Sequence, residues 1–256
     1  MSILLVDIGN TRAKWAVLRG GRLSAPRALA HRTARADLSA LVRAAPRDVE
    51  RVIAVSVMGR KFERALASAV RARFGLRTEF VRSARQAAGV RNGYREVWRL
   101  GADRWVGVIA AHALAGARPA LVVSIGTALT VDAVTSDGRH LGGAIAPGPD
   151  TMVSSLLSGT QGIRRRANGA RRTRQRSPGL FAADTASALD AGAAFAAAAF
   201  IDRARIEART TLGTSPLLLL TGGAARALRP YIKSAFRLVP DLVLRGLAVL
   251  AVDEGA

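Results

Sequence analysis

The residues around Asp7 carry side chains that could bind a nucleotide phosphate and its metal ion. Asp7 follows a short apolar run at residues 3–6 and precedes Gly9-Asn10-Thr11. Such a turn leaves backbone N–H groups and the Asn10 and Thr11 side chains able to face a phosphate. The Asp7 carboxylate could hold Mg²⁺, directly or through water, because Mg²⁺ binds one or two carboxylates together with substrate phosphates. A hairpin turn in which Asp7 only caps the backbone would use the same residues.

Asp103 and Arg104 form a second candidate site, where an acid and a cation stand side by side at the predicted start of a helix. An aspartate there also stabilises the helix dipole, which needs no substrate. A cation at a helix N-terminus is mildly unfavourable, however, so the pair favours a substrate site. The aspartate would take a proton from a hydroxyl during phosphoryl transfer, and the arginine would bind an anionic end of the substrate.

The elements that must position these residues alternate between strands and helices. Apolar runs predict strands at residues 3–6, 51–57, 78–82, 120–127 and 217–220. Periodic segments with caps or breakers predict helices at residues 37–45, 61–74, 102–115, 185–212 and 242–252. Gly20-Gly21 predicts a hairpin between residues 14–19 and 22–29. This order indicates an α/β fold, in which ligands bind at the carboxyl ends of the strands.

The layout of the first segment recurs at an offset of 117 residues, which places Ser124 where Asp7 stands and Gly126 where Gly9 stands. A predicted hairpin follows in both copies. We therefore expect a duplicated α/β unit, with domains at residues 1–117 and 118–256 and a cleft between them. Gly222-Gly223 follows a third buried strand, so three glycine turns predict a nucleotide held from both sides. None of them fits the P-loop or the G-x-G-x-x-G pattern.

The net charge of +21 comes from 39 Lys and Arg against 18 Asp and Glu, and only Lys14, Lys61 and Lys233 are lysines. Most arginines are spread along the chain, but residues 164–176 hold a cluster that we interpret as an exposed loop. A nucleic-acid site would need interleaved aromatic residues or a recognition helix, and this cluster has neither. We expect no nucleic-acid partner, although part of the loop could lie over an anionic substrate.

Composition excludes several other classes of protein. The chain has no cysteine, which excludes disulfides, thiolate metal sites and a cysteine nucleophile. Its start lacks the features of a signal peptide, and no window approaches 18 uncharged apolar residues. Half of the 256 residues are apolar, which is enough for a substantial core. We therefore expect a soluble cytoplasmic protein without membrane contact.

Taken together, the motifs resemble those of the type III pantothenate kinases over nearly the whole chain. The matching segments are Asp7-x-Gly9-Asn10-Thr11 with Lys14, Asn92-Gly93-Tyr94, Gly101-x-Asp103-Arg104-Trp105, Gly126-Thr127-Ala128 with Thr130 and Asp132, Gly142-Gly143-x-Ile145-x-Pro147-Gly148, and Thr221-Gly222-Gly223. The resemblance implies the duplicated ribonuclease H-like fold of the acetate kinase, sugar kinase, Hsp70 and actin superfamily. It also implies a homodimer that uses ATP to phosphorylate the 4′-hydroxyl of pantothenate, the first step towards coenzyme A.

The same resemblance assigns roles to individual residues. It makes Asp103 the catalytic base and Asp7 the residue near Mg²⁺. It implies ATP contacts at Asp7, Ile8, Gly9, Asn10, Thr11, Arg12, Ala13, Lys14, Thr127 and Gly222. It implies pantothenate contacts at Tyr94, Gly101, Ala102, Asp103, Arg104 and, across the dimer interface, Thr185. From residue type alone, Lys14 could equally be an outward strand residue, and Tyr94 a core ring with its hydroxyl at the rim.

The sequence departs from the family pattern in places that affect the site. Many members have an aspartate at the position of Ser124, where it binds a required monovalent cation. A serine hydroxyl carries no charge, so we expect activity without added K⁺ or NH₄⁺. Glu96-Val97-Trp98 replaces the usual Pro-Glu-Gln segment. Two rival hypotheses are another kinase or phosphatase of the same superfamily, and a regulator that binds nucleic acid through the arginine cluster.

Overall fold

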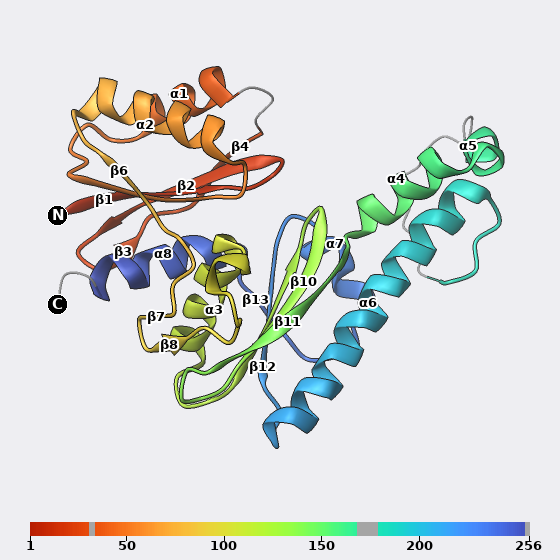
Figure 1. Cartoon of the computed structure of the whole chain (residues 1–256). Coiled ribbons are helices and arrows are strands. Elements are labelled where there is room, and N and C mark those ends of the chain that lie inside the picture. Colours follow the sequence, from red (N-terminus) through yellow and green to blue (C-terminus); the bar gives the residue numbers. More distant parts are fainter. Residues whose placement is uncertain (31–33, 168–178, 254–256) are drawn as a thin grey trace. The chain divides into compact units, whose positions relative to one another are not determined.

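The computed structural model describes residues 1–30, 34–167 and 179–253 (Figure 1). The chain divides into two compact units. The first unit comprises Met1–Ala117, Val134–Gly142 and Asp241–Ala256, and the second comprises Arg118–Ala133 and Gly143–Pro240. The C-terminal segment therefore returns to the first unit. The domains expected from the sequence repeat, residues 1–117 and 118–256, stay a prediction.

A mixed sheet forms the centre of the first unit, with the strand order β3-β2-β1-β5-β6 and β4 paired to β2. Its strands are β1 (Ser2–Ile8), β2 (Arg12–Arg19), β3 (Arg22–Leu23), β4 (Arg27–Ala30), β5 (Arg51–Ser56) and β6 (Thr78–Phe80). β1 is antiparallel to β2 and parallel to β5, which is in turn parallel to β6. The carboxyl ends of three neighbouring strands therefore meet at one edge of the sheet.

Helices cover both faces of this sheet (Figure 1). Leu4 and Val6 of β1 belong to a core cluster with residues of α1 (Ala34–Ala44) and α2 (Arg60–Phe74). On the other face, α8 (Leu242–Asp253) contacts β1, β2 and β5, and α3 (Ala102–Ala115) contacts β5 and α8. Gly246 allows this close helix pair, because a Cβ there would lie 2.1 Å from the Val106 carbonyl oxygen. Burial on both faces explains why β1 is a continuous apolar run.

The rest of the first unit is irregular and surrounds the start of α3. It contains a two-stranded sheet of β7 (Gln86–Ala87) and β8 (Val90–Arg91), followed by the 3₁₀ turn η1 (Val97–Arg99). The end of the hairpin formed by β10 (Ala128–Val134) and β11 (His140–Pro147), residues 134–142, also belongs to this unit. It contacts β8 through a bridge between Arg91 and Arg139.

The second unit repeats the strand order of the first, as β11-β10-β9-β12-β13. Its strands are β9 (Ala120–Ile125), β10 (Ala128–Val134), β11 (His140–Pro147), β12 (Leu217–Thr221) and β13 (Arg237–Leu238). The long α6 (Thr185–Leu212) packs on this sheet, and α7 (Ala225–Leu228) and η2 (Arg229–Tyr231) follow β12 in the sequence. α4 (Pro149–Gly159) and α5 (Gln161–Ala167) lie along α6 beyond the edge of the sheet (Figure 1).

Most predicted strands and helices are present, with two corrections. The predicted strand at residues 22–29 is split into β3 and β4, because Pro26 between them has no N–H to donate to a neighbouring strand. Arg164, Arg165 and Arg166 were expected in a loop, but they lie in α5, and arginine is a good helix former. The rest of the arginine cluster, residues 171–176, lies outside the described residues. Within the described parts of the chain, no helix is long and apolar enough to span a membrane.

Candidate functional site

Asp7 and Lys14 lie opposite each other on the hairpin of β1 and β2. Strand side chains alternate between the two faces of a sheet, and Val6 and Ile8 face α1 and α2. Asp7 therefore points to the opposite face, towards the side covered by α3 and α8. Trp15 packs in the same cluster as Val6, so Lys14 also points to the Asp7 face. The hairpin register thus places a lysine beside the carboxylate.

A tight turn connects these two strands. The Gly9 N–H donates a hydrogen bond to the Arg12 carbonyl oxygen at 3.1 Å, and a Cβ at Gly9 would lie 3.3 Å from that oxygen. Asn10 and Thr11 are exposed at the tip, as is Arg12. The side chains of Ile8 and Ala13 are completely buried, so only their backbone groups can contact a ligand.

The surroundings of Asp7 make its negative charge costly. Burial raises the pKa of Asp7 from its ordinary value of 3.8 to about 7. The charge of Lys14 opposes this rise, whereas the charge of Asp103 adds to it. The effect of Asp103 brings the two candidate carboxylates of the sequence into one electrostatic environment, although they are 96 residues apart (103 minus 7).

The start of α3 holds Asp103 beside a glycine. Gly101 is the N-cap residue, and its carbonyl oxygen accepts the Trp105 N–H at 2.9 Å. Trp105 is buried to 1% exposure and fixes this first turn in the core. A Cβ at Gly101 would lie 2.8 Å from Asp103 Oδ1. The missing side chain therefore leaves space at the carboxylate, which any larger residue would take.

Arg104 is held by an aromatic pair. Its Nη1 donates a hydrogen bond to the Tyr94 hydroxyl at 2.9 Å, and its guanidinium lies 5.6 Å from the centroid of the same ring. The Tyr94 ring also stacks on His140, with centroids 6.0 Å apart and an interplanar angle of 11°. His140 is 1% exposed. The chain from His140 through Tyr94 fixes the position of a cation next to Asp103.

Backbone and side-chain contacts of Asn92 and Gly93 hold Tyr94 in position. The Asn92 side chain donates to the Ala84 carbonyl oxygen at 3.1 Å and accepts the Tyr94 N–H at 3.0 Å. Gly93 lies against the β10–β11 hairpin, where a Cβ would be 2.0 Å from the His140 carbonyl oxygen. No other residue could occupy that position without moving the backbone.

In the second unit, three glycine turns pack against one another at the carboxyl end of β9. A Cβ at Gly148 would lie 1.9 Å from the Gly126 carbonyl oxygen, and a Cβ at Gly222 would lie 2.3 Å from the Ile125 carbonyl oxygen. Gly222 also has a φ of +94°, a conformation that favours glycine. The Thr127 carbonyl oxygen accepts hydrogen bonds from the Gly148 N–H at 2.9 Å and from Thr151 Oγ1 at 2.6 Å. Thr127 itself is exposed.

Ser124 and Thr185 lie elsewhere in the same unit. Ser124 is partly buried near the end of β9 and pairs in register with Thr221 of β12. Thr185 is the first residue of α6, directly after the N-cap Asp184, which accepts the Ser187 N–H at 2.9 Å. The candidate residues thus form two sets, one in each unit. Asp7, Lys14, Tyr94, Asp103 and Arg104 belong to the first, and Thr127, Gly222 and Thr185 to the second.

The sequence pattern did not identify His140 as part of the site. Its signal was weak, because a single histidine two residues before Gly142-Gly143 could as well be a core residue. Among the described residues, no group of three or more His, Asp or Glu side chains could hold a metal ion by itself. A cation at Asp7 would therefore need further oxygen atoms from a ligand.

Comparisons with known proteins agree on one family. A sequence model of the family described as type III pantothenate kinase matches residues 3–206. A relative from Azoarcus sp. (strain BH72), named type III pantothenate kinase, is 39% identical over 256 residues, which cover 99% of this chain and 92% of the relative. A relative of the same name from Nitrosococcus oceani is 34% identical and covers 98% of this chain and 94% of its own length.

Solved structures share the fold at much lower identity. A conserved Campylobacter jejuni protein, whose name assigns it to the Baf family of transcriptional activators, has a TM-score of 0.60 at 19% identity and covers 99% of this chain and 100% of its own. A Sinorhizobium meliloti protein named as a 2-dehydro-3-deoxygalactonokinase has a TM-score of 0.57 at 17% identity, covering 97% and 98%. The fold is therefore α/β, as the sequence predicted, with two sheets of matching strand order.

Proposed function

The chain belongs to the type III pantothenate kinase family, and from this premise we propose that it transfers a phosphoryl group from ATP to a hydroxyl of pantothenate. The observation that supports this proposal most strongly is the arrangement in the first unit. A carboxylate at a glycine turn, a lysine, and an Asp–Arg pair at a helix start share one region of the protein. These are the residue types that phosphoryl transfer to an alcohol requires.

Asp7, Lys14 and the Gly9–Thr11 turn are proposed to hold the phosphates of ATP. The exposed side chains of Asn10 and Thr11 can donate hydrogen bonds, and Lys14 can serve a phosphate as a point charge. A divalent cation fits the residues present, because a carboxylate that is costly to ionise alone is stabilised by a bound positive charge. When bound, Mg²⁺ would neutralise charge on the transferring phosphoryl group. Phosphate oxygens would complete its ligands.

Asp103 is proposed as the general base. The carboxylate would take the proton of the pantothenate hydroxyl while that oxygen forms a bond to the γ-phosphorus. The bond from the γ-phosphorus to the bridging oxygen breaks, and ADP leaves with the electron pair. Gly101 supports this role, because its missing side chain leaves room for an alcohol beside Asp103 Oδ1. Ala102, between Gly101 and Asp103, is the first residue of α3.

Arg104 and Tyr94 are proposed to bind pantothenate. Pantothenate carries a carboxylate, and a guanidinium fixed by a hydrogen bond and an aromatic ring is a suitable partner for it. Thr185 is proposed to contact pantothenate bound to a second copy of the chain, which makes the active form a homodimer. Thr127 and Gly222 are proposed as further ATP contacts, because their turns offer closely packed backbone groups. A cytoplasmic location stays a prediction.

The test is ADP release by the purified protein in a coupled assay with pantothenate, and with acetate and a panel of sugars as competing acceptors. We expect turnover with pantothenate only. Asp103→Asn should reduce kcat by at least about 100-fold, which is the lower end of the usual contribution of a general base. Asp48→Asn is the matched control, because Asp48 is an exposed carboxylate paired with Arg19.

Turnover with a sugar or acetate but not pantothenate would refute the substrate. Near-full activity of Asp103→Asn would refute the assignment of the base and leave the substrate intact. A protein without turnover that binds nucleic acid, with an affinity that falls steeply as salt rises, would favour the regulator hypothesis instead.

A further inference from the structure

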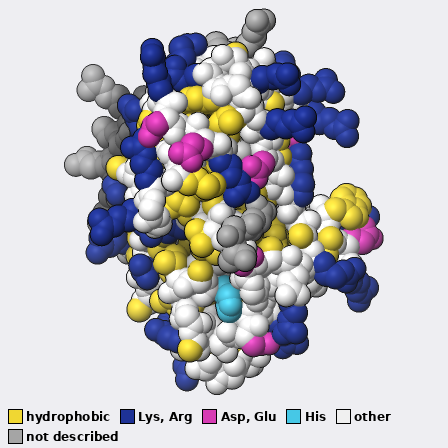
Figure 2. All heavy atoms as spheres, turned by 90° about the vertical axis from the view of Figure 1, so that its left-hand side faces the viewer, with side chains coloured by type: hydrophobic (Ala, Val, Ile, Leu, Met, Phe, Trp, Pro, Cys, Tyr) yellow, Lys and Arg dark blue, Asp and Glu magenta, His cyan; other side chains and the backbone are white. Residues whose placement is uncertain are grey.

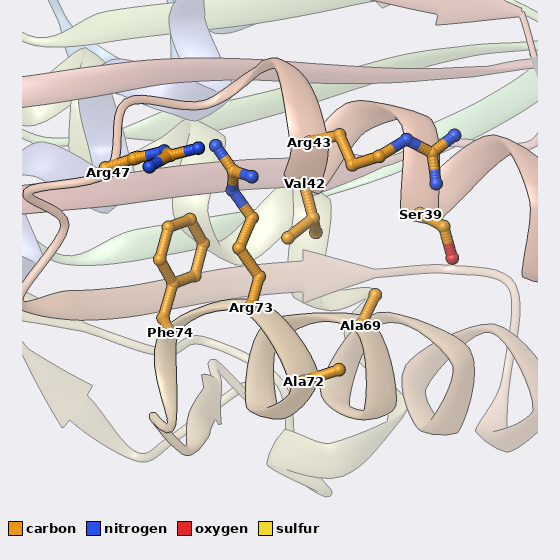
Figure 3. A pocket seen from close by; sticks show the side chains of 8 residues that line it. All are labelled: Ser39, Val42, Arg43, Arg47, Ala69, Ala72, Arg73 and Phe74. Carbon is orange, nitrogen blue, oxygen red and sulfur yellow. The ribbon is translucent and has the colours of Figure 1, made fainter.

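A separate cavity lies between α1 and α2, on the sheet face opposite to Asp7. Its volume is about 570 Å³, within the range of small-molecule sites. The lining residues are Ser39, Val42, Arg43, Arg47, Ala69, Ala72, Arg73 and Phe74 (Figure 3). None of them belongs to the proposed kinase site, and all lie in the first unit.

Three of the eight lining residues are arginines, and none is acidic. In Figure 3 the guanidinium groups of Arg47 and Arg73 lie next to each other at one end of the cavity, and Arg43 lies towards the other end. The carboxylate closest in sequence is Asp48, which is engaged by Arg19 Nη2 at 2.6 and 2.7 Å. The cavity thus combines a concave surface with three positive charges.

Arginines alone would prove little in this protein. Figure 2 shows Lys and Arg side chains spread widely over the face in view rather than collected in one patch. An arginine at a cavity is therefore expected by chance, and a binding site needs a sign that the side chain is held in place. Arg73 gives that sign.

Arg73 is fixed by its neighbours. Its Nη2 donates a hydrogen bond to the Ala45 carbonyl oxygen at 3.0 Å, and its guanidinium lies 5.4 Å from the centroid of the Phe74 ring. Its Nε is buried and has no hydrogen-bond partner among the described residues. A cation that is already held in place binds an anion with a smaller loss of entropy.

The remaining lining residues determine the kind of anion. Ala69, Ala72 and Phe74 offer an apolar wall, Val42 is almost fully buried behind it, and Ser39 offers one hydroxyl. Inorganic phosphate would use the arginines but leave this wall in contact with water. From these contacts we propose that the cavity between α1 and α2 binds a small organic phosphate, with its phosphate at the arginines and its apolar group on Ala69, Ala72 and Phe74.

The test uses phenyl phosphate as the probe, measured by titration calorimetry with a saturating non-hydrolysable ATP analogue to occupy the nucleotide site. Arg43→Ala/Arg47→Ala should weaken binding by about 100-fold, or roughly tenfold for each guanidinium removed. Both side chains are exposed, so this variant should fold normally. Arg64→Ala/Arg71→Ala is the matched control, because it removes two exposed arginines from α2 that do not line the cavity.

We expect the control to bind phenyl phosphate within about twofold of the native protein, and phenol to bind at least about tenfold more weakly than phenyl phosphate. Equal decreases in affinity in the two double variants would mean that only overall charge matters, and would overturn the proposal. So would the absence of phenyl phosphate binding, or binding that the Arg43 and Arg47 substitutions leave unchanged. Inorganic phosphate that binds as tightly as phenyl phosphate would overturn the role of the apolar wall.

Discussion

Replacing Asp7 with asparagine should stabilise the protein while it removes activity. Asparagine has nearly the same shape but cannot ionise, so Asp7→Asn avoids the cost of a buried negative charge. The pKa of Asp7 rises from 3.8 to about 7, and each pH unit corresponds to about 1.36 kcal/mol. Above pH 7 the ionised carboxylate therefore destabilises the native protein by about 4 kcal/mol relative to the same group in the unfolded chain.

The sign of this effect predicts its dependence on pH. Between pH 3.8 and about 7, the native state holds a proton on Asp7 that the unfolded chain has released, so stability falls as the pH rises. Asp7→Asn lacks this dependence. In urea unfolding without divalent cations, its stability relative to the native protein should therefore increase by about 3 kcal/mol between pH 5 and pH 8.

Three outcomes would refute this reasoning. One is a stability difference that does not change with pH, since that would mean Asp7 titrates normally. Another is an Asp7→Asn protein that is less stable at pH 8, which would show that the carboxylate makes strong native contacts. The third is full kinase activity in Asp7→Asn, which would remove Asp7 from the proposed phosphate site. Asp48→Asn, at an exposed ion pair, should neither stabilise the protein nor remove kinase activity, and it serves as the control.

Three further predictions concern other parts of the site. Tyr94→Phe keeps the ring but loses the hydroxyl that accepts the Arg104 hydrogen bond, so KM for pantothenate should rise by about tenfold with kcat within about twofold; an unchanged KM would contradict the role of this pair. Gly148→Ala should raise KM for ATP and lower stability, because its Cβ would lie 1.9 Å from a backbone oxygen of the neighbouring turn. Gly159→Ala is the control at the other end of α4, whose N-cap is Gly148. Its Cβ would meet no atom within 4 Å, so neither the KM for ATP nor the stability should change. Finally, Ser124 offers no negative charge, so rates in Na⁺, K⁺ and NH₄⁺ buffers should agree within about twofold; strict dependence on K⁺ or NH₄⁺ would refute this.

The fold could be predicted largely from apolar runs and glycine positions. The buried strands β1, β5, β9 and β12 are short continuous apolar segments, and such segments are distinctive because both faces of the sheet are covered. The assignment of the C-terminal helix to the first unit could not be predicted in this way. That packing depends on Gly246 lying against Val106, a contact between residues 140 positions apart (246 minus 106).

Candidate residues could be proposed from the sequence where their side-chain type suggests a reaction. Residues that only hold those side chains in position could not. Asp7, Asp103 and Arg104 could be proposed from the sequence, because Asp7 follows a buried strand and a cation beside Asp103 is unfavourable at a helix N-terminus unless it binds a ligand. His140 was not, because its role comes from stacking on Tyr94 and from the approach of its carbonyl oxygen to Gly93. Such supporting contacts join distant segments and have no local pattern. The same holds for the cavity at Arg73, whose lining comes from two helices and the turn after α1.

The two carboxylates of the first unit explain why the proposed site needs its ligands. Burial and the charge of Asp103 both disfavour the ionised form of Asp7, and Lys14 offsets only part of this cost. Without a ligand, the protonated form of Asp7 is therefore favoured to a higher pH than for an ordinary aspartate. A bound cation would favour the ionised form of Asp7. Its positive charge would offset the negative charge of Asp103, which raises the pKa of Asp7. We therefore expect Asp7→Asn to bind Mg²⁺ with ATP more weakly than the native protein, because the variant lacks the carboxylate proposed to hold the cation.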